Sequence, residues 1–349
     1  RDGQPTKRGV VEMAGFPVRV PTLDIHTIGA GGGSIAWVDP GGLLKVGPQS
    51  AGADPGPVAY GRGGEEVTLT DANITLGRLN PGALLAGRMT MDAAAARAAV
   101  ETKIADPLGL SVEEAAIGIV RVAASGIARA IRSVASAKGY NPADFSLFAY
   151  GGAGPLLASD VNDEVGCRRI LVPREPGTLC ARGILLSDQT FDFVRTILGR
   201  ATEEGWQRAC KAFGELEKQA EEWLAKDNVP ECARAYRRYV EARYEGQSFE
   251  VRVQFEQPID NVSLEAFLSA FHAEHKTQYS YDIQERHVEI VNCRLEAVGE
   301  TPKPPMESTG AGEDGSHSSD TRKVHFGAGG RWLDAAIRNR ASLAPGEQI

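Results

Sequence analysis

Phe145-Ser146-Leu147-Phe148-Ala149-Tyr150, followed by Gly151-Gly152-Ala153-Gly154-Pro155, is the stretch that decides the fold of this chain. Its first six residues are typical of a buried strand, and the glycines and proline after them indicate a turn. A short helix is expected from Leu156 to Val165, and a second strand over 169–173. This strand–helix–strand order predicts two parallel strands and hence an α/β domain.

Before this unit, the sequence predicts one long helix from about 112 to 138. Ser111-Val112-Glu113-Glu114 has the form of a capping box, in which the hydroxyl and the carboxylate satisfy free amides at a helix start. Apolar residues then recur at helical spacing, and Lys138-Gly139 provides a cation and a glycine stop. Residues 1–90 are rich in glycine and proline, which favours short strands and loops over long helices.

The second half of the chain has an α+β pattern. The expected elements are an amphipathic helix over 202–226, a hairpin around Tyr244-Glu245-Gly246-Gln247 with a strand over 249–255, a helix from Ser263 to about 276, and a strand over 287–295. His272 and His275 share one face of that last helix, a spacing that metal sites use. With no third ligand nearby, we interpret them as residues of a surface helix.

These patterns divide the chain into four parts. We predict an α/β domain over 1–198, a smaller α+β domain over 199–298, a linker over 299–320 and the start of a C-terminal β element over 321–349. Both ends look cut, since the chain begins at Arg1 rather than a methionine and stops directly after a Pro-Gly-Glu-Gln turn.

Composition excludes several classes of protein. The chain has 349 residues, a formal charge of −8 and 42% hydrophobic residues, which is the composition of an ordinary globular protein. No basic patch suits nucleic acid, and no apolar run is long enough to span a bilayer. The five cysteines form no C-x-x-C pair. We therefore expect a cytoplasmic protein without nucleic-acid or membrane partners.

The segment Asp24-Ile25-His26-Thr27-Ile28-Gly29-Ala30-Gly31-Gly32-Gly33-Ser34, called here the first glycine loop, is a candidate phosphate site. Gly29 and Gly31 to Gly33 permit positive φ and let backbone N–H groups approach an anion without a Cβ in the way. Thr27 and Ser34 add hydroxyl donors. Glycine clusters also serve tight strand corners, so spacing alone leaves both readings open.

Asp24 and His26 are the catalytic candidates of this loop. Asp24 ends an apolar segment, and its carboxylate could hold Mg²⁺ or a water of that ion. His26 could donate to a phosphate or act as an acid or base, or it could be a hydrogen-bonded structural histidine.

The second glycine loop is Gly151-Gly152-Ala153-Gly154-Pro155. Between a strand and a helix start, its amides and the helix dipole favour an anion, or a flat ring can lie on bare backbone. It has neither the spacing of a dinucleotide fold nor the Gly-Lys-Ser/Thr of a P-loop. An architecture with two glycine loops is therefore favoured, with Gly151, Gly152, Ala153 and Gly154 in the nucleotide site.

A proline-stiffened loop over 47–64, followed by Thr70-Asp71-Ala72-Asn73, lies between the two glycine loops in sequence. Rigid loops of this length commonly line sites. Asp71 is its catalytic candidate, and Asp54, Arg62 and Asn73 are its candidates for substrate contact. Asp71 could instead cap a helix, and Arg62 could be solvated.

Taken together, Asp24 to Ser34, Gly47 to Gly64, Thr70 to Asn73 and Gly151 to Pro155 resemble the hydantoinase A/oxoprolinase family. The resemblance continues through Arg243-Tyr244-Glu245-Gly246-Gln247 and through the strand at Val288, and so covers nearly the whole chain.

The resemblance implies the second half of an actin/hexokinase-like ATPase core, followed by a smaller α+β domain. By this likeness the first glycine loop is similar to the second phosphate loop of that core, and Gly151 to Pro155 to its adenosine loop. The implied cofactors are ATP and Mg²⁺, and the implied partner is a hydantoinase B-type subunit in a homo- or hetero-oligomer. The implied reaction is ATP-dependent hydrolysis of a cyclic amide of hydantoin or 5-oxoproline type, through a phosphorylated intermediate.

Two alternatives stay open. The first is a subunit of a ketone carboxylase that acts on acetone or acetophenone, as related chains do. The second is a non-catalytic scaffold subunit. It is considered because Leu157 replaces the family's histidine after the second glycine loop, and because Cys180-Ala181-Arg182-Gly183 departs from the family's Ser-Ala-x-Gly element.

Overall fold

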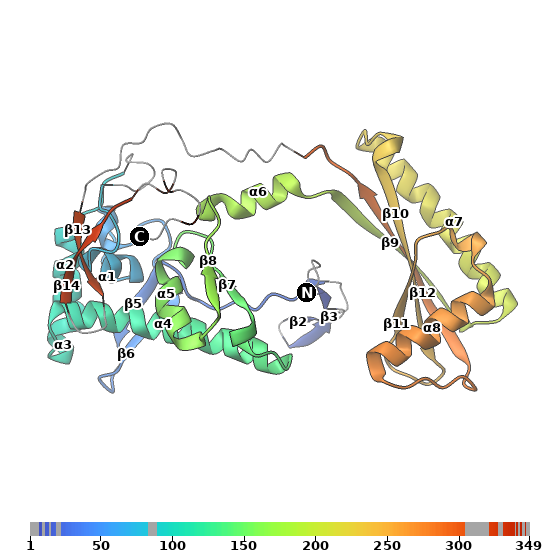
Figure 1. Ribbon diagram of the computed structural model, residues 1–349, viewed down its shortest axis with the longest axis horizontal. Coiled ribbons are helices and arrows are strands. Elements are labelled where there is room, and N and C mark those ends of the chain that lie inside the picture. Colours follow the sequence, from blue (N-terminus) through green and yellow to red (C-terminus); the bar gives the residue numbers. More distant parts are fainter. Residues whose placement is uncertain are drawn as a thin grey trace. The chain divides into compact units, whose positions relative to one another are not determined.

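The computed structural model describes residues 7–8, 11–13, 15–18, 22–82, 89–303, 321–326 and 331–338, with the single residues 340, 343 and 346. The described residues form two compact units (Figure 1). The first takes its residues from 1–180 and 307–349, and the second from 181–306. The predicted domain boundaries stay a prediction.

The N-terminal part of the first unit is built from short antiparallel pairs. β1 (Lys7–Arg8) pairs with β4 (Thr22–Leu23), β2 (Val11–Met13) with β3 (Phe16–Val18), and β5 (Ser34–Val38) with β6 (Leu44–Ser50). The 3-10 turn η1 (Val58–Tyr60) and helix α1 (Leu69–Thr75) follow. Then come α2 (Ala93–Val100), a π-helical turn (Glu101–Ala105) and α3 (Asp106–Leu108).

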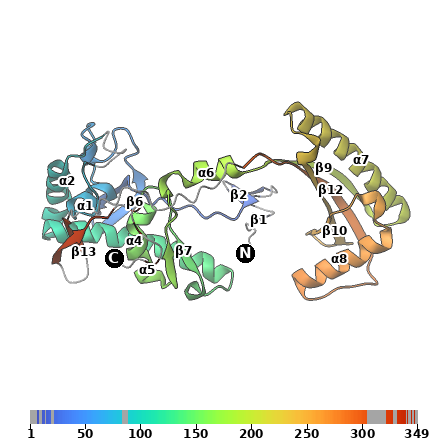
Figure 2. The same ribbon diagram turned by 45° about the horizontal axis from the view of Figure 1, so that its top comes forward.

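The centre of the first unit is the long helix α4 (Val112–Ala137), capped by Ser111 and Glu114 in the predicted capping box. β7 (Ser146–Phe148), α5 (Gly154–Val165) and β8 (Arg169–Leu171) form the predicted strand–helix–strand unit, with β7 and β8 parallel. The expectation that the first strand is buried is wrong, since the side chains of Phe145 and Phe148 are 49% and 50% exposed. α4 and α5 pack against each other (Figure 2), and their buried apolar residues share one core with residues of β5 and α1. The α/β prediction is confirmed here.

The hairpin of β13 (Thr321–Phe326) and β14 (Arg331–Ala336) also belongs to the first unit. The His325 N–H donates to the Leu76 carbonyl at the end of α1, at 2.9 Å. The C-terminal β element expected over 321–349 thus contains two strands in its described part. Within the linker predicted for 299–320, residues 304–320 lie outside the described residues.

The second unit is one antiparallel sheet with the strand order β11-β10-β12-β9 and two helices on one face. Its strands are β9 (Gln189–Arg200), β10 (Arg234–Tyr244), β11 (Val251–Phe255) and β12 (Val288–Gly299). Helices α7 (Glu203–Lys226) and α8 (Leu264–Tyr279) bury aromatic and aliphatic side chains against it. α6 (Leu179–Leu186) crosses from the first unit into the second.

The helices and strands predicted after residue 200 are confirmed within a few residues. The expectation of mostly strands and loops over 1–90 is wrong at α1, because Thr68 and Asp71 form a capping box and start a helix there. Among the described residues, no helix is long and apolar enough to cross a membrane.

Candidate functional site

The first glycine loop is held in place by hydrogen bonds that two of its own backbone carbonyls accept. The Gly32 carbonyl accepts both the N–H and the hydroxyl of Thr70, each at 2.9 Å, at the start of α1. The Gly33 carbonyl accepts the Ala51 N–H at 2.8 Å, after β6. No acceptor among the described residues takes the N–H groups of Gly32 and Gly33. Two rigidly placed backbone donors therefore remain available.

Ser34 closes the loop on itself. Its Oγ accepts the Gly31 N–H at 2.9 Å, and its own N–H donates to the Gly31 carbonyl at 3.0 Å. The hydroxyl predicted to meet a phosphate is buried and organises the turn instead.

Close approach explains Gly32 and Gly33 better than backbone conformation does, whereas a Cβ on Gly31 would meet nothing within 4 Å. None of Gly29, Gly31, Gly32 and Gly33 has a positive φ, so the expectation that they exploit positive φ is wrong. A Cβ on Gly32 would lie 2.8 Å from Thr70 Oγ1, and one on Gly33 would lie 2.8 Å from Ser50 Oγ. The backbone passes too near its neighbours for a side chain at these two positions.

The second glycine loop places a helix start at the same site. Gly151 has φ +83° and donates its N–H to the Pro176 carbonyl at 2.8 Å. α5 begins directly after, with Pro155 in its first turn and no side-chain cap. The N–H groups of Gly152 and Ala153 have no acceptor among the described residues. The positive end of the α5 dipole is thus not neutralised by a capping side chain.

A cavity of about 640 Å³ joins the two loops. The first loop contributes Ala30 and Gly31 to Gly33, and the second contributes Gly151 to Gly154. The remaining wall comes from the residues between the loops in sequence and from the start of α5: Gly52, Pro57, Tyr60, Leu69, Thr70, Asn73, Leu79, Met91, Tyr150, Leu156 and Leu157. The sequence-predicted loops are therefore neighbours in space.

The described wall of this cavity has no charged side chain. Its polar groups are backbone amides together with the side chains of Tyr60, Thr70, Asn73 and Tyr150. A negative charge on a ligand would therefore interact with backbone N–H dipoles rather than with charged side chains of this wall, which is how glycine-rich anion sites act.

Asp24, His26 and Thr27 do not line the cavity. Asp24 forms an ion pair with Lys138, just after the end of α4, and its side chain is only 4% exposed. His26 and Thr27 are exposed. No group of three potential metal-ligating side chains occurs within the described ranges. The catalytic roles of Asp24 and His26, the Thr27 contact and the magnesium role of Asp24 stay predictions.

Asp71 is fully buried and has a structural role. Its carboxylate accepts the N–H groups of Ala59 and Thr68 at 2.8 Å, the Val58 N–H at 3.3 Å, and the Thr68 hydroxyl at 2.7 Å. It therefore caps α1 and ties it to η1. This geometry does not bring Asp71 into the cavity, and we assign it no catalytic step.

Of the three predicted substrate contacts, the structure brings only Asn73 to the described cavity wall. Asp54 and Arg62 are exposed, and the Arg62 guanidinium lies 3.6 Å from Met89 Sδ. Sequence reasoning missed Tyr60 and Thr70 as wall residues. The Thr-x-x-Asp capping pattern at Thr68 signals the start of α1, but no local pattern signals the contact of Thr70 with the first glycine loop.

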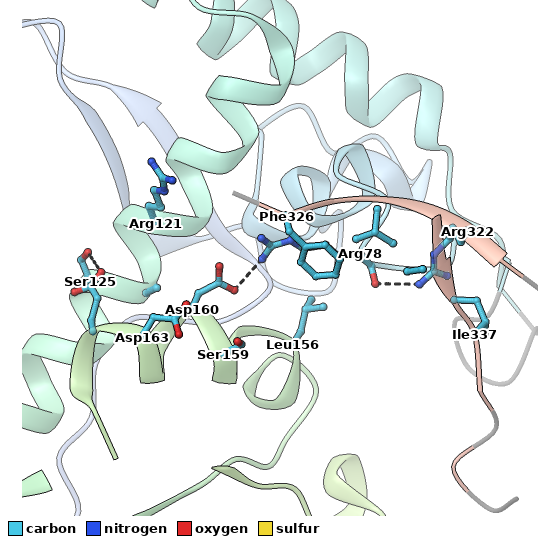
Figure 3. Close-up of a pocket in the computed structure, with 14 residues that line it drawn as sticks. Arg78, Arg121, Ser125, Leu156, Ser159, Asp160, Asp163, Arg322, Phe326 and Ile337 are labelled. Atoms are coloured by element: carbon cyan, nitrogen blue, oxygen red, sulfur yellow. Dashed lines mark hydrogen bonds and ion pairs between the residues drawn. The ribbon is translucent and has the colours of Figure 1, made fainter. Parts of the chain in front are cut away.

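A second cavity, of about 600 Å³, lies between α4, α5 and the β13–β14 hairpin (Figure 3). Arg78 crosses it, with Nη1 2.8 Å from Asp160 Oδ2 and Nε 3.4 Å from the His325 carbonyl oxygen. The guanidinium carbon lies 5.9 Å from the centre of the Phe326 ring. These contacts attach the hairpin to the rest of the first unit.

The histidines of α8 are not a surface pair. His275 is 0% exposed, with Nδ1 2.8 Å from the Tyr281 carbonyl oxygen and Nε2 3.2 Å from Gln247 Nε2. His272 Nδ1 lies 2.7 Å from Tyr244 Oη, and burial lowers the pKa of His272. The surface-helix interpretation is wrong for His275, because the Tyr244–Gln247 turn folds over it.

Two family profiles match the chain. The hydantoinase/oxoprolinase profile covers residues 1–193, and the profile of the hydantoinase/oxoprolinase C-terminal domain covers 200–349. The chain belongs to the hydantoinase/oxoprolinase family.

Two curated relatives with different names illustrate the range of this family. The chain is 36% identical over 344 residues to caprolactamase subunit alpha of Pseudomonas jessenii, covering 96% of this chain and 49% of that one. It is 30% identical over 360 residues to 5-oxoprolinase of Saccharomyces cerevisiae, covering 96% of this chain and 27% of the relative.

Solved structures agree on the fold. A nucleotide-free structure of acetone carboxylase matches with a TM-score of 0.84 at 27% identity, over 98% of this chain and 50% of that chain. The ATP-dependent caprolactamase of P. jessenii matches with a TM-score of 0.68 at 34% identity, over 95% of this chain and 49% of that chain. The chain spans about half the length of each of these two relatives.

Proposed function

We propose that this chain is the nucleotide-binding part of an A-type subunit that hydrolyses a cyclic amide with ATP. The observation that carries the proposal is the convergence of two glycine loops on one cavity, with uncapped amides at Gly32, Gly33, Gly152 and Ala153. Caprolactamase, 5-oxoprolinase and acetone carboxylase are relatives, and two of these are described as ATP-dependent. We further propose the actin/hexokinase-like core for the first unit.

The reaction uses ATP to turn a poor electrophile into a good one. The amide oxygen attacks the γ-phosphorus and ADP leaves, after which water adds to the activated carbon, the ring C–N bond breaks and the ring nitrogen leaves as an amine with a proton from that water. The acyl phosphate that remains is hydrolysed by a second water to the carboxylate and inorganic phosphate. Overall, cyclic amide, ATP and two waters give the open amino acid, ADP and inorganic phosphate.

The residues of this chain would bind and orient the phosphates rather than exchange protons. The Gly32 and Gly33 amides are fixed by Thr70 and Ala51, so little reorganisation is needed when charge develops on a nearby oxygen. At the second loop, the α5 dipole adds positive potential. The fit to a polyphosphate rests on the N–H groups of Gly32 and Gly33, which have no acceptor among the described residues and belong to the cavity wall.

Magnesium fits the described residues less well. Asp24, its predicted ligand, is paired with Lys138, and we derive no step through the metal. The proposed B-type partner would complete the reaction centre, in keeping with the relatives that are described as subunits.

A ketone carboxylase is the second candidate, favoured by the TM-score of 0.84 to acetone carboxylase. ADP release by the full-length protein with its partner subunit distinguishes the two. We expect ADP release with caprolactam, 5-oxoproline or a hydantoin, and none with acetone plus bicarbonate. ADP release with acetone plus bicarbonate, and with none of the cyclic amides, would overturn the proposal. Absence of turnover and of nucleotide binding would favour a scaffold subunit, an interpretation motivated by the buried Leu157 in the cavity wall.

A further inference from the structure

The second cavity differs from the cavity of the glycine loops in its charged groups. Side chains of both signs line it, between α4, α5 and the β13–β14 hairpin (Figure 3). Those that already have a partner are Arg78, Arg121, Asp160 and Glu164. Within the described wall, this leaves Arg322 on β13 and Asp163 on α5.

Arg322 keeps one nitrogen that a ligand can reach. Its Nη2 donates to the Arg78 carbonyl at 3.3 Å, and its Nε is buried. Nη1 has no acceptor in the described part of the chain and is not among the buried atoms, so it stays accessible in this half-buried residue. No carboxylate of the described residues forms an ion pair with this guanidinium. Its positive charge is therefore available to a ligand.

Asp163 offers the opposite charge in the same wall. The residue is exposed, and neither a cation nor a hydrogen-bond donor from the described ranges binds its carboxylate. An exposed carboxylate is ordinary by itself. This one is distinguished by the cavity that it shares with Arg322, because that cavity holds two accessible and opposite charges that do not pair with each other.

The side chain of Arg78 lies between these two charges. Its carbonyl oxygen contacts Arg322, while its guanidinium, at the far end of the side chain, contacts Asp160. Asp163 follows Asp160 by three residues on α5, which is roughly 4.5 Å along the helix axis. In Figure 3, Asp163 and Arg322 lie on opposite sides of the Arg78–Asp160 pair. A ligand that contacts both charges must therefore be extended.

Apolar side chains line the region between the two charges. They are Leu156 of α5, Val324 and Phe326 of β13, and Ile337 just after β14. Leu156 and Phe326 lie between the charged ends in Figure 3. A ligand with charged ends and methylene groups between them matches this order, because the methylenes bury apolar area and the ends form charge-assisted hydrogen bonds.

We infer that the second cavity binds an ω-amino acid, with the carboxylate at Arg322 Nη1 and the ammonium at Asp163. The inference rests on the proposed function, since ring opening of a simple lactam releases this kind of zwitterion. The closed lactam is neutral and offers neither group a charge, so the cavity discriminates the product from the substrate.

The same cavity narrows the class of cyclic amide. A hydantoin opens to a ureido acid that has no ammonium group, and 5-oxoproline opens to an amino acid whose ammonium lies beside a carboxylate. Neither product presents an ammonium and a carboxylate only at its two far ends. The substrate class is thus a lactam, and its product has a site apart from the cavity of the glycine loops.

Isothermal titration calorimetry of the full-length protein without nucleotide tests this site. The probe is 6-aminohexanoate. Hexanoate lacks its ammonium, hexylamine lacks its carboxylate, and glycine lacks the long spacer. We expect the probe to bind at least about tenfold more tightly than each of these, because each hydrogen bond to a charged group contributes about that factor. An excess of caprolactam should not displace the probe, since the neutral ring belongs to the other cavity.

Variants assign the two ends of the ligand. Asp163→Asn should weaken binding of 6-aminohexanoate to that of hexanoate and leave hexanoate unchanged, because only the ammonium contact is lost. Arg322→Gln should weaken both ligands by about tenfold or more. Lys323→Gln is the matched control, because Lys323 is next to Arg322 on β13, its side chain is 73% exposed, and it is not in the cavity wall. It should leave both affinities unchanged.

Every outcome bears on the inference or on the proposed function. No binding of 6-aminohexanoate, binding equal to that of hexanoate, displacement by caprolactam, or wild-type affinity in Asp163→Asn or folded Arg322→Gln would overturn the inference, while ATP-dependent turnover would still support the proposed function. If Arg322→Gln does not fold, Asp163→Asn and the ligand comparisons decide. If 6-aminohexanoate binds as expected but no cyclic amide elicits ATP turnover, the proposed function fails and the zwitterion site remains.

Discussion

Asp71 Oδ1 accepts the Ala59 N–H at 2.8 Å and so joins helix α1 to the η1 turn, next to the cavity of the two glycine loops. The same carboxylate caps α1 through Thr68. One buried side chain thus positions both the helix that fixes the first glycine loop and the turn that contributes Tyr60 to the wall.

Asp71→Asn should destabilise the protein by about 1–3 kcal/mol, because an amide NH₂ would face backbone N–H groups that now have an acceptor. Urea unfolding measures this. Asp92→Asn is the matched control: Asp92 caps α2 by accepting the Ala95 N–H at 2.8 Å in an exposed position, and asparagine caps as well as aspartate. Equal effects of the two substitutions would contradict the role assigned to Asp71.

Gly32→Ala should weaken nucleotide binding by at least about tenfold, because the new Cβ would lie 2.8 Å from Thr70 Oγ1 and displace the loop. The nucleotide-dependent rise in melting temperature of the full-length protein measures this. Gly126→Ala on α4 is the control. A Cβ there has nothing within 4 Å, and alanine in a helix should raise stability by about 0.5–1 kcal/mol. Nucleotide binding as tight as in the wild type would show that Gly32 is not part of the site.

Arg78→Lys should loosen the β13–β14 hairpin. Lysine keeps the charge opposite Asp160 but loses the Nε donor to the His325 carbonyl and the planar group near Phe326. We expect a loss of about 1–3 kcal/mol in unfolding free energy and faster amide exchange in 321–326. Arg97→Lys is the control, since Arg97 and Glu113 form a more exposed pair at 3.0 Å. Unchanged exchange in the hairpin would contradict the attachment.

Glu241 should make the second unit sensitive to acid. Burial would raise its pKa, but the Asn292 hydrogen bond and the charges of Arg294 and Arg252 outweigh burial and hold the pKa below its ordinary value. The stability it contributes is present above about pH 4.3, the unfolded value, and is lost as the pH falls through the lower folded pKa.

Urea unfolding between pH 7 and pH 3 measures this. Glu241→Gln should lower stability at pH 7 and flatten its decline below pH 5. Glu245→Gln is the control, because Glu245 pairs with Arg200 on the surface. Its curve should nearly coincide with that of the wild type, and a flattening equal to that of Glu241→Gln would contradict the assignment.

The regular elements could be predicted because their signals are local. Ser111 and Glu114 start α4 as their spacing predicts, and the apolar run before Gly151 forms β7. A helix at α1 was expected only as an alternative, through a cap at Asp71, because glycine and proline dominate residues 1–90 and the Thr68–Asp71 cap is a four-residue signal in a loop-like context.

Placement of the site residues depended on long-range contacts that spacing does not encode. The likeness of the two glycine loops to a nucleotide site could be seen in the sequence, and their shared cavity agrees with it. The pairing of Asp24 with Lys138, more than a hundred residues later, could not be foreseen, nor could the burial of Asp71 beneath η1. The local sequence around a carboxylate in a glycine-rich segment is the same whether that carboxylate caps a helix or faces a ligand.

The decisive measurement of ATP-dependent amide hydrolysis is the ratio of ADP released to rings opened, taken for a cyclic amide with and without ATP in the full-length protein with its partner. We expect one ADP for each ring opened and no ring opening when ATP is left out. Ring opening at the same rate without ATP, or ADP release only when a ketone and bicarbonate replace the amide, would contradict it.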